Sequence, residues 1–230
     1  MPVSKRTHIN KAASASGNHG RTKPEPRWPA SLSVTVAVVL YVVLPNTLII
    51  GPRYLIPALE LVLLLPLSIL NPYREVHETK ALRFLAIGLI ALVNLANFAS
   101  LALLVYRLLN SANVNAKTLV YAALAVWFTN IIVFGLWFWE LDRGGPAKRN
   151  THHERNPDFL FPQMTQPSLA PGNWSPNFLD YLYVALTNAT AFSPTDTMPL
   201  SSAAKALMSG ESVISMLTVI IVAARAVNIL

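Results

Sequence analysis

The sequence predicts an all-α integral membrane protein with about five transmembrane helices and a short helical segment that re-enters the membrane before the last of them. Three observations lead to this fold class. Of the 230 residues, 53% are hydrophobic and only 13% are charged, whereas soluble domains carry about 25% charged residues. The apolar residues gather in five runs, most of them near the roughly 20 residues that a helix needs to span a bilayer. A partly polar, proline-bearing segment, 180–205, leads directly into the last run.

The apolar runs divide the chain into three regions. Residues 1–28 hold six basic residues among Ser, Asn, Gly and Pro and show no apolar periodicity, so we expect a disordered basic tail. Residues 29–116 contain three runs and are expected to form a three-helix membrane region. Residues 117–230 contain the other two, with a long loop and the segment 180–205 between them. The runs cover 31–50, 54–70, 82–108, 117–140 and 203–229; the second is the shortest and carries Pro57 and Pro66.

The distribution of basic residues predicts the orientation of the chain. The net charge is +7, and most basic residues lie in the tail and in the loops. Basic residues in these places face anionic lipid on the cytoplasmic side. Counted by loop, they place the amino terminus and the long loop in the cytoplasm. We therefore expect the bilayer, and not a nucleic acid, as the partner of these charges.

Several chemical functions find no support in the sequence. The chain has no cysteine, which excludes disulfides, thiol catalysis and cysteine-based metal sites. The pair His152 and His153, with Glu154 and Asp158 nearby, lies on a proline-interrupted stretch that we interpret as a solvated loop rather than a metal site. No catalytic motif is visible, so we expect neither an enzyme nor a cofactor.

Five polar residues fall inside the apolar runs, where such groups are costly and mark candidate sites. They are Glu60, Asn94, Asn97, Asn130 and Glu211. We expect the three asparagines, together with Ser100, to form hydrogen bonds between helices. For Glu60 and Glu211, two interpretations stay open: a protonated or paired structural group, or a group on a polar pathway.

The segment 180–205 reads DYLYVALTNATAFSPTDTMPLSSAAK. A stretch of helical character is followed by a short irregular run and then by a long apolar helix. Irregular backbone at membrane depth is tolerated only where protein buries it or where it lines a water-filled cavity. This layout predicts a pore loop. Its candidate residues are Thr190, Ala191, Phe192, Ser193, Pro194, Thr195, Asp196 and Pro199.

This segment resembles the pore module of potassium channels and their bacterial relatives, which consists of outer helix, pore helix, filter and inner helix. In an alignment without gaps, 181–191 corresponds to the pore helix, and Thr190 to the first threonine before the filter. Asp196 and Pro199 correspond to the acidic residue and the proline after the filter, and Lys205 to the basic residue that opens the inner helix. The resemblance implies a homo-oligomer, with a tetramer as the family's arrangement, and a monovalent ion as the conducted species.

The whole chain also resembles small bacterial membrane proteins with a channel-like carboxyl end, which implies an integral protein of the bacterial inner membrane. The filter, however, departs from the family. Its Gly-Tyr-Gly core is replaced by Ser193, Pro194 and Thr195. Glycines permit the backbone angles that aim carbonyls at the ion, whereas proline and a β-branched residue do not. We therefore expect no potassium selectivity.

The charge distribution conflicts with the family's topology, because potassium channels insert the pore loop from outside. Either the loop enters from the cytoplasmic side, as in ionotropic glutamate receptors, or the second apolar run is re-entrant and every later segment flips.

Three hypotheses on function follow. The first is an oligomeric channel for a small ion or solute, and the second is a non-conducting structural or accessory protein that retains the pore-loop fold. The third is a transporter that uses Glu60 and Glu211.

Overall fold

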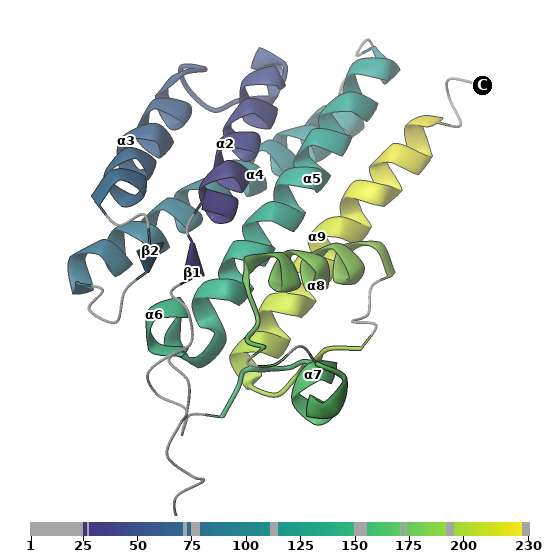
Figure 1. The fold of residues 1–230 in the computed structure, drawn as a ribbon. Helices are drawn as coiled ribbons and strands as arrows, with labels where there is room; N and C mark the ends of the chain where they lie inside the picture. Colours follow the sequence, from purple (N-terminus) through teal and green to yellow (C-terminus); the bar gives the residue numbers. More distant parts are fainter. Residues whose placement is uncertain are drawn as a thin grey trace, which may run out of the picture.

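The computed structural model describes residues 25–26, 28–70, 73–74, 79–110, 115–149, 156–170, 172, 174–191 and 196–226. Over these residues the fold is a helical bundle with two short antiparallel ribbons (Figure 1). The first half comprises β1 (Glu25–Pro26), α2 (Trp28–Val43), η1 (Asn46–Leu48), α3 (Leu55–Leu70), β2 (Tyr73–Arg74), α4 (Lys80–Asn110) and α5 (Ala116–Leu141). The second half comprises η2 (Asp142–Gly144), α6 (Pro146–Arg149), β3 (Phe159–Leu160), α7 (Pro162–Thr165), η3 (Pro167–Leu169), α8 (Phe178–Ala191), β4 (Met198–Pro199) and α9 (Ser202–Ala226).

Three helices, α4, α5 and α9, are long and apolar enough to cross a membrane. They have 31, 26 and 25 residues, or about 46, 39 and 37 Å at 1.5 Å per residue. The helices α2 and α3 are also apolar but have 16 residues each, or about 24 Å. This is less than the ~30 Å of bilayer hydrocarbon. The all-α fold class is therefore confirmed, with three long apolar helices and two shorter ones.

The first apolar run, 31–50, does not form one continuous helix. The helix α2 begins earlier, at Trp28, and ends at Val43. The reason is Pro45, which lacks an N–H and disfavours helical backbone angles at the residue before it. The chain continues as the short helix η1, which buries Leu48, and then turns into α3 at Gly51, where φ is +79°.

Side-chain caps fix where the long helices begin. The Thr79 hydroxyl accepts a hydrogen bond from the Leu82 N–H at 3.4 Å, and the Asn115 side chain accepts one from the Lys117 N–H at 2.9 Å. The Ser201 hydroxyl accepts one from the Ala204 N–H at 3.1 Å. Such caps satisfy amide donors that have no partner inside the helix.

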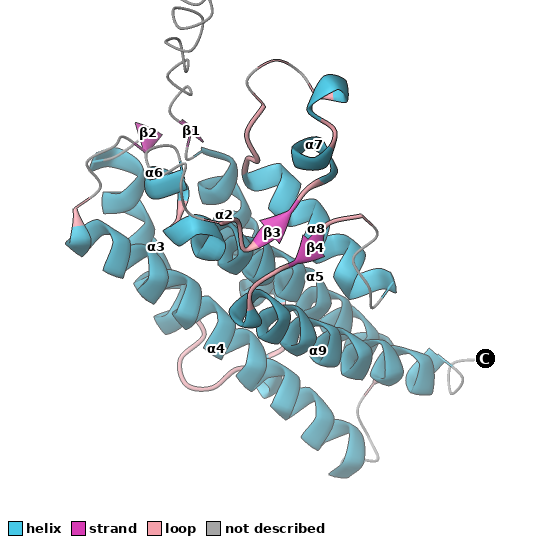
Figure 2. Cartoon of the chain, turned by 90° about the horizontal axis from the view of Figure 1, so that it is seen from below, coloured by secondary structure: helices cyan, strands magenta, loops and turns pink. Residues whose placement is uncertain are grey.

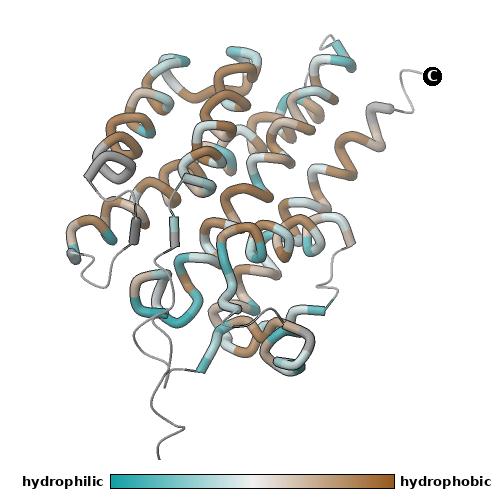
Figure 3. Tube along the Cα trace, in the orientation of Figure 1, coloured by the Kyte–Doolittle hydropathy of each residue, from teal (hydrophilic) through white to brown (hydrophobic). Residues whose placement is uncertain are grey.

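The helix α5 is the centre of the bundle and packs against α2, α4, α8 and α9. Its apolar residues contribute to both hydrophobic clusters of the core. Figure 3 shows apolar residues along the middle of the helices and polar residues gathered toward the ends of the bundle. This banding matches a protein whose helices lie in a bilayer.

One end of the bundle holds the start of α2, the α3–α4 connection, the end of α5 and the start of α9 (Figure 1). The Arg83 side chain, near the start of α4, donates a hydrogen bond to the carbonyl of Gly144, directly after α5. The opposite end holds η1, the end of α4, the start of α5 and the end of α9. The long loop after α5 therefore lies at the same end as the start of α2, as the basic residues predict.

The helix α8 does not run through the bundle. With 14 residues it extends over about 21 Å. The ribbon of β3 and β4 connects the segments before and after it, with Phe159 opposite Pro199 and Leu160 opposite Met198 (Figure 2). The described segments before and after α8 therefore meet in this ribbon.

Close packing between α5 and α8 depends on Gly135. A Cβ atom at this buried position would lie 3.1 Å from the Cα of Leu182 and 3.5 Å from its amide nitrogen. Both atoms belong to the backbone of α8 and cannot rotate away. The absence of a side chain at Gly135 therefore sets how near α8 lies to α5.

We expect Gly135→Val to push α8 away from α5 and to destabilise the protein by about 1–3 kcal/mol, as overpacking does. The measurement is thermal unfolding in detergent, followed by tryptophan fluorescence. Gly88→Val is the matched control, because Gly88 is also helical but has open space at its Cβ. Equal stability of the two variants would contradict the role of Gly135.

The arrangement of the helix ends predicts from which side of the membrane each introduced cysteine can be labelled. The chain has no cysteine, so single cysteines can be introduced at exposed positions without background. We expect Thr79→Cys and Ser168→Cys to react with an impermeant thiol reagent from one side of the membrane, and Asn46→Cys and Asn110→Cys from the other. Labelling of Asn46→Cys from the same side as Thr79→Cys would instead make α2 and α3 a re-entrant hairpin.

Candidate functional site

Two buried polar clusters hold α8 in place, one near each of its ends. The cluster near its start joins α8 to the end of α5 and to α6. The cluster near its end joins α8 to α9. Between them, α8 buries an apolar stripe at helical spacing: Phe178, Tyr181, Val184, Ala185, Asn188 and Ala189.

The first cluster is built on Asp142, Arg149 and Tyr181, all of which are buried. The Tyr181 hydroxyl donates a hydrogen bond of 2.6 Å to Oδ2 of Asp142, and Nη1 of Arg149 lies 3.9 Å from the same oxygen. The Arg149 guanidinium also donates to the Tyr181 hydroxyl and, at 3.0 Å, to the carbonyl of Trp139. A buried charge pair of this kind is tolerated because each member is paired and hydrogen-bonded.

The sequence interpretation of Asp158 as part of a solvated loop is wrong. Asp158 is buried, and its carboxylate accepts a hydrogen bond of 2.9 Å from the Arg143 N–H. Its own N–H donates to Oδ1 of Asp142 at 2.7 Å. The physical reason is the turn after α5, where Arg143, Gly144 and Gly145 have positive φ angles and bring this loop onto Asp142. His152, His153 and Glu154 lie outside the described residues.

Two reciprocal side-chain hydrogen bonds cap the start of α8. The Asn177 side chain accepts from the Leu179 N–H at 2.9 Å, and the Asp180 carboxylate accepts from the Asn177 N–H at 2.7 Å. This is a capping box. Burial raises the pKa of Asp180, while the hydrogen bond from Asn177 and the charge of Arg149 act in the opposite direction.

The second cluster surrounds Glu211, a fully buried residue of α9. Its Oε2 accepts a hydrogen bond of 2.7 Å from Nδ2 of Asn188 on α8. The same amide nitrogen donates to the carbonyl of Met208 at 2.9 Å, and Oδ1 of Asn188 accepts from the Ser212 hydroxyl at 3.2 Å. The Asn188 amide thereby connects α8 to two successive turns of α9.

Asn130 of α5 reaches the same part of α9. Its Nδ2 donates to the Ser215 hydroxyl at 3.0 Å and to the backbone carbonyl of Glu211 at 3.4 Å. The predicted interhelical hydrogen bond is therefore confirmed for Asn130. We call the set of Asn130, Asn188, Glu211, Ser212 and Ser215 the Glu211 cluster.

Two oxygens of the Glu211 cluster, Oε1 of Glu211 and Oδ1 of Asn130, are buried and have no hydrogen-bond partner among the described residues. The amide oxygen of Asn130 is a hydrogen-bond acceptor, and the carboxyl oxygen of Glu211 is one as long as it carries no proton. A buried acceptor without a partner costs about 1–3 kcal/mol. Chemically, the cluster is therefore a set of oxygens that would accept a proton or a small cation.

The residues of the predicted pore loop are described only in part. Thr190 and Ala191 close α8 with exposed side chains, and the Thr190 hydroxyl donates to the carbonyl of Leu186 at 2.8 Å. Asp196 is exposed and Pro199 belongs to β4. Phe192, Ser193, Pro194 and Thr195 lie outside the described residues.

The other polar residues of the apolar runs are not part of the Glu211 cluster. Glu60 is 1% exposed on α3, with Oε2 lacking a partner among the described residues, and Tyr41 of α2 lies close enough to interact with its charge. Asn97 and Ser100 lie on the buried face of α4, and Asn94 is half-buried beside them. The structure therefore brings together Asn130 and Glu211 of the five predicted residues.

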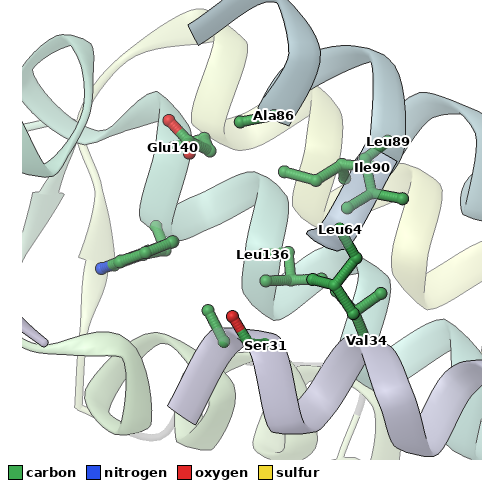
Figure 4. Close-up of a pocket in the computed structure, with 10 residues that line it drawn as sticks. Ser31, Val34, Leu64, Ala86, Leu89, Ile90, Leu136 and Glu140 are labelled. Carbon is green, nitrogen blue, oxygen red and sulfur yellow. The ribbon is translucent and has the colours of Figure 1, made fainter. Parts of the chain in front are cut away.

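A separate pocket lies between α2, α3, α4 and α5, with an empty volume of about 360 Å³ including the space at its mouth. Figure 4 shows apolar side chains around it, among them Val34, Leu64 and Ile90, with the Glu140 carboxyl at one edge. None of its lining residues belongs to α8 or α9. The pocket is therefore distinct from the Glu211 cluster, which is the candidate site.

The sequence interpretation missed Asn188 and the roles of Asp142, Arg149 and Tyr181. For Asn188, a signal exists in the sequence. It lies on the apolar stripe of α8, seven residues after Tyr181 and three after Ala185, and a polar residue on such a stripe faces the bundle. For Asp142 and Arg149, no local signal exists, because both lie in a loop with many charges.

Arg149→Met is expected to destabilise the protein by about 3 kcal/mol, because it leaves the carboxylate of Asp142 buried without a cation. Lys148→Met is the matched control, since Lys148 is the exposed neighbour on the same short helix. It should change stability by less than about 0.5 kcal/mol. Thermal unfolding in detergent measures both; an Arg149→Met variant as stable as its control would contradict the importance of this pair.

Comparison with protein-family models, with curated proteins and with solved structures finds no match to this chain. The evidence for its function therefore comes from its own residues alone. It consists of three long apolar helices, the short helix α8 held between α5 and α9, and the Glu211 cluster.

Proposed function

We propose that this chain is a multi-pass protein of the bacterial inner membrane whose α5, α8 and α9 form a pore module. In this proposal, α5 is the outer helix, α8 the pore helix and α9 the inner helix. The helices α2 and α3, each about 24 Å long, also cross the membrane, where the bilayer is locally thinned. Copies of the chain assemble around a shared path for a small ion or solute. Catalysis is not part of the proposal.

The observation that carries the proposal is the placement of α8. It is too short to span the hydrocarbon, packs between two long apolar helices, and begins and ends on connections to the same end of the bundle. A short helix of this kind, buried along one side, satisfies its backbone without crossing the bilayer. The sequence after α8, with Pro194 and Pro199, is expected to be non-helical and therefore to line a cavity, because lipid-exposed irregular backbone is not tolerated.

Oligomerisation is supported by the exposed apolar face of α9. Of the three long helices, α9 is the least buried within the chain. Its exposed residues include Val213, Met216, Leu217 and Ile220. One pore loop encloses no path by itself, so a conducting protein of this design requires neighbouring copies, for which a tetramer is the arrangement we propose.

A non-conducting structural role is the alternative, and the substituted filter favours it. Ser193, Pro194 and Thr195 lack the backbone freedom of the glycines that a potassium filter requires. A transporter that uses both buried glutamates has less support. Glu60 belongs to α3 and Glu211 to α9, which lie on opposite flanks of the bundle (Figure 1).

Ion flux into liposomes tests conduction. Purified protein is reconstituted and loaded with dyes for Na⁺, K⁺, H⁺ and Cl⁻, and we expect flux of at least one monovalent ion. The double variant Asp196→Ala/Pro199→Ala should reduce this flux to that of empty liposomes. The double variant Pro167→Ala/Ser168→Ala, in the exposed helix η3, is the control and should retain it. Equal flux from wild type and the Asp196/Pro199 variant for every ion would support the non-conducting alternative.

A further inference from the structure

The Glu211 carboxyl lies in the one described part of α9 that is enclosed by both α5 and α8. It has no solvent exposure, and within the described part of the chain its only side-chain hydrogen bond is the one from Asn188. An ionised carboxylate in such a place has a large desolvation cost unless a positive charge is near. One amide N–H does not supply that charge.

Among the residues that the structure describes, no cationic side chain forms an ion pair with the Glu211 carboxyl. The ionisable residues on the elements that pack against α9 are Lys80, Arg83, Tyr106 and Arg107 of α4, Lys117, Tyr121 and Glu140 of α5, and Asp180, Tyr181 and Tyr183 of α8; α9 itself carries Lys205 and Arg225. A cation bound at the Glu211 carboxyl would supply the missing charge.

The unpartnered oxygens of the cluster show where this cation would bind. Nδ2 of Asn130 already donates to Ser215 and to the Glu211 carbonyl, which leaves Oδ1 of Asn130 free as an acceptor beside α9. Oε1 of Glu211 is the second free acceptor. Carboxylate and amide oxygens are the ligands that hard cations prefer. A single carboxylate balances one positive charge, which favours a monovalent over a divalent cation.

We propose that Glu211 and Asn130 form the binding site of one exchangeable monovalent cation, a proton or Na⁺. A proton on Oε1 turns that oxygen into a hydrogen-bond donor, and a Na⁺ ion would instead take the free oxygens of the cluster as ligands. Since Oε2 of the same carboxyl holds Asn188, occupancy of the site also sets how firmly α8 is attached to α9. The proposal goes beyond conduction, because a protein that passes no ions could bind this cation.

Infrared difference spectroscopy of the full-length protein in lipid nanodiscs tests the site, because the C=O stretch of a protonated carboxylic acid is resolved from that of a carboxylate. Spectra are compared across about pH 5 to pH 9, and at fixed pH between Na⁺ and choline at equal ionic strength. Wild type, Glu211→Gln and Glu60→Gln are measured. Glu60→Gln is the control for the other buried glutamate.

We expect an acid band that Glu60→Gln retains, that Glu211→Gln lacks, and that disappears as the pH rises. Its loss on addition of Na⁺ at fixed pH identifies Na⁺ as a ligand, whereas an unchanged band identifies the proton alone. Asn130→Ala should move the midpoint at least about tenfold in proton or Na⁺ concentration. An unchanged midpoint removes Asn130 from the site, and a Glu211 band that responds to neither pH nor Na⁺ overturns the proposal.

Carbodiimide labelling of the wild-type protein covers the case in which Glu211→Gln does not fold. A hydrophobic carbodiimide reacts with protonated carboxyls inside the bilayer, and mass spectrometry locates the adduct. The expected result is labelling of Glu211 that falls with rising pH. A yield at Glu211 that does not depend on pH, or its complete absence, would overturn exchange at this residue. Neither experiment measures ion flux. A failed flux assay would therefore count against conduction and not against the cation site.

Discussion

The buried contact between Asp142, Arg149 and Tyr181 is the interaction on which the arrangement of the carboxyl-terminal half depends. Asp142 directly follows α5, Arg149 ends α6 and Tyr181 belongs to α8, so one cluster connects the turn after α5 to a helix that begins more than 30 residues later. The same carboxylate also accepts backbone hydrogen bonds from Asp158 and Phe159. Because the cluster is removed from water, loss of one member would leave the others with unpaired charge or polar atoms.

From this cluster the position of α8 follows. Tyr181 holds its first half, Gly135 lets it lie close to α5, and Asn188 binds its second half to α9. Hydrogen bonds at both ends fix the rotation of α8 about its axis. Apolar packing alone is less directional and would permit more than one rotation. A helix of 14 residues has little propensity to form alone. These contacts therefore explain why α8 exists as a helix at this place.

The bilayer environment explains why these polar groups contribute so much to the association of the helices. Lipid chains are as apolar as leucine, so helices in a membrane associate through close packing and hydrogen bonds rather than through the hydrophobic effect. Gly135 provides the close packing, and the Glu211 cluster provides the hydrogen bonds. The cluster also retains two unpartnered oxygens, which a purely structural set of hydrogen bonds would not require. This excess of acceptors is what makes it a candidate cation site.

The sequence by itself determined that the chain is helical and apolar, approximately where its helices lie, and that the loop after α5 returns to the end of the bundle where α2 begins. These features follow from hydropathy, proline positions and the placement of basic residues, all of which act locally. It also identified Asn130 and Glu211, because polar residues inside apolar runs are visible in the sequence. Only the tertiary structure decided that these two lie in one cluster with Asn188, and that Asp158 is buried on the turn after α5. The reason is that such contacts join residues 15 to 85 positions apart, and their formation depends on helix rotation and backbone turns that no local pattern specifies.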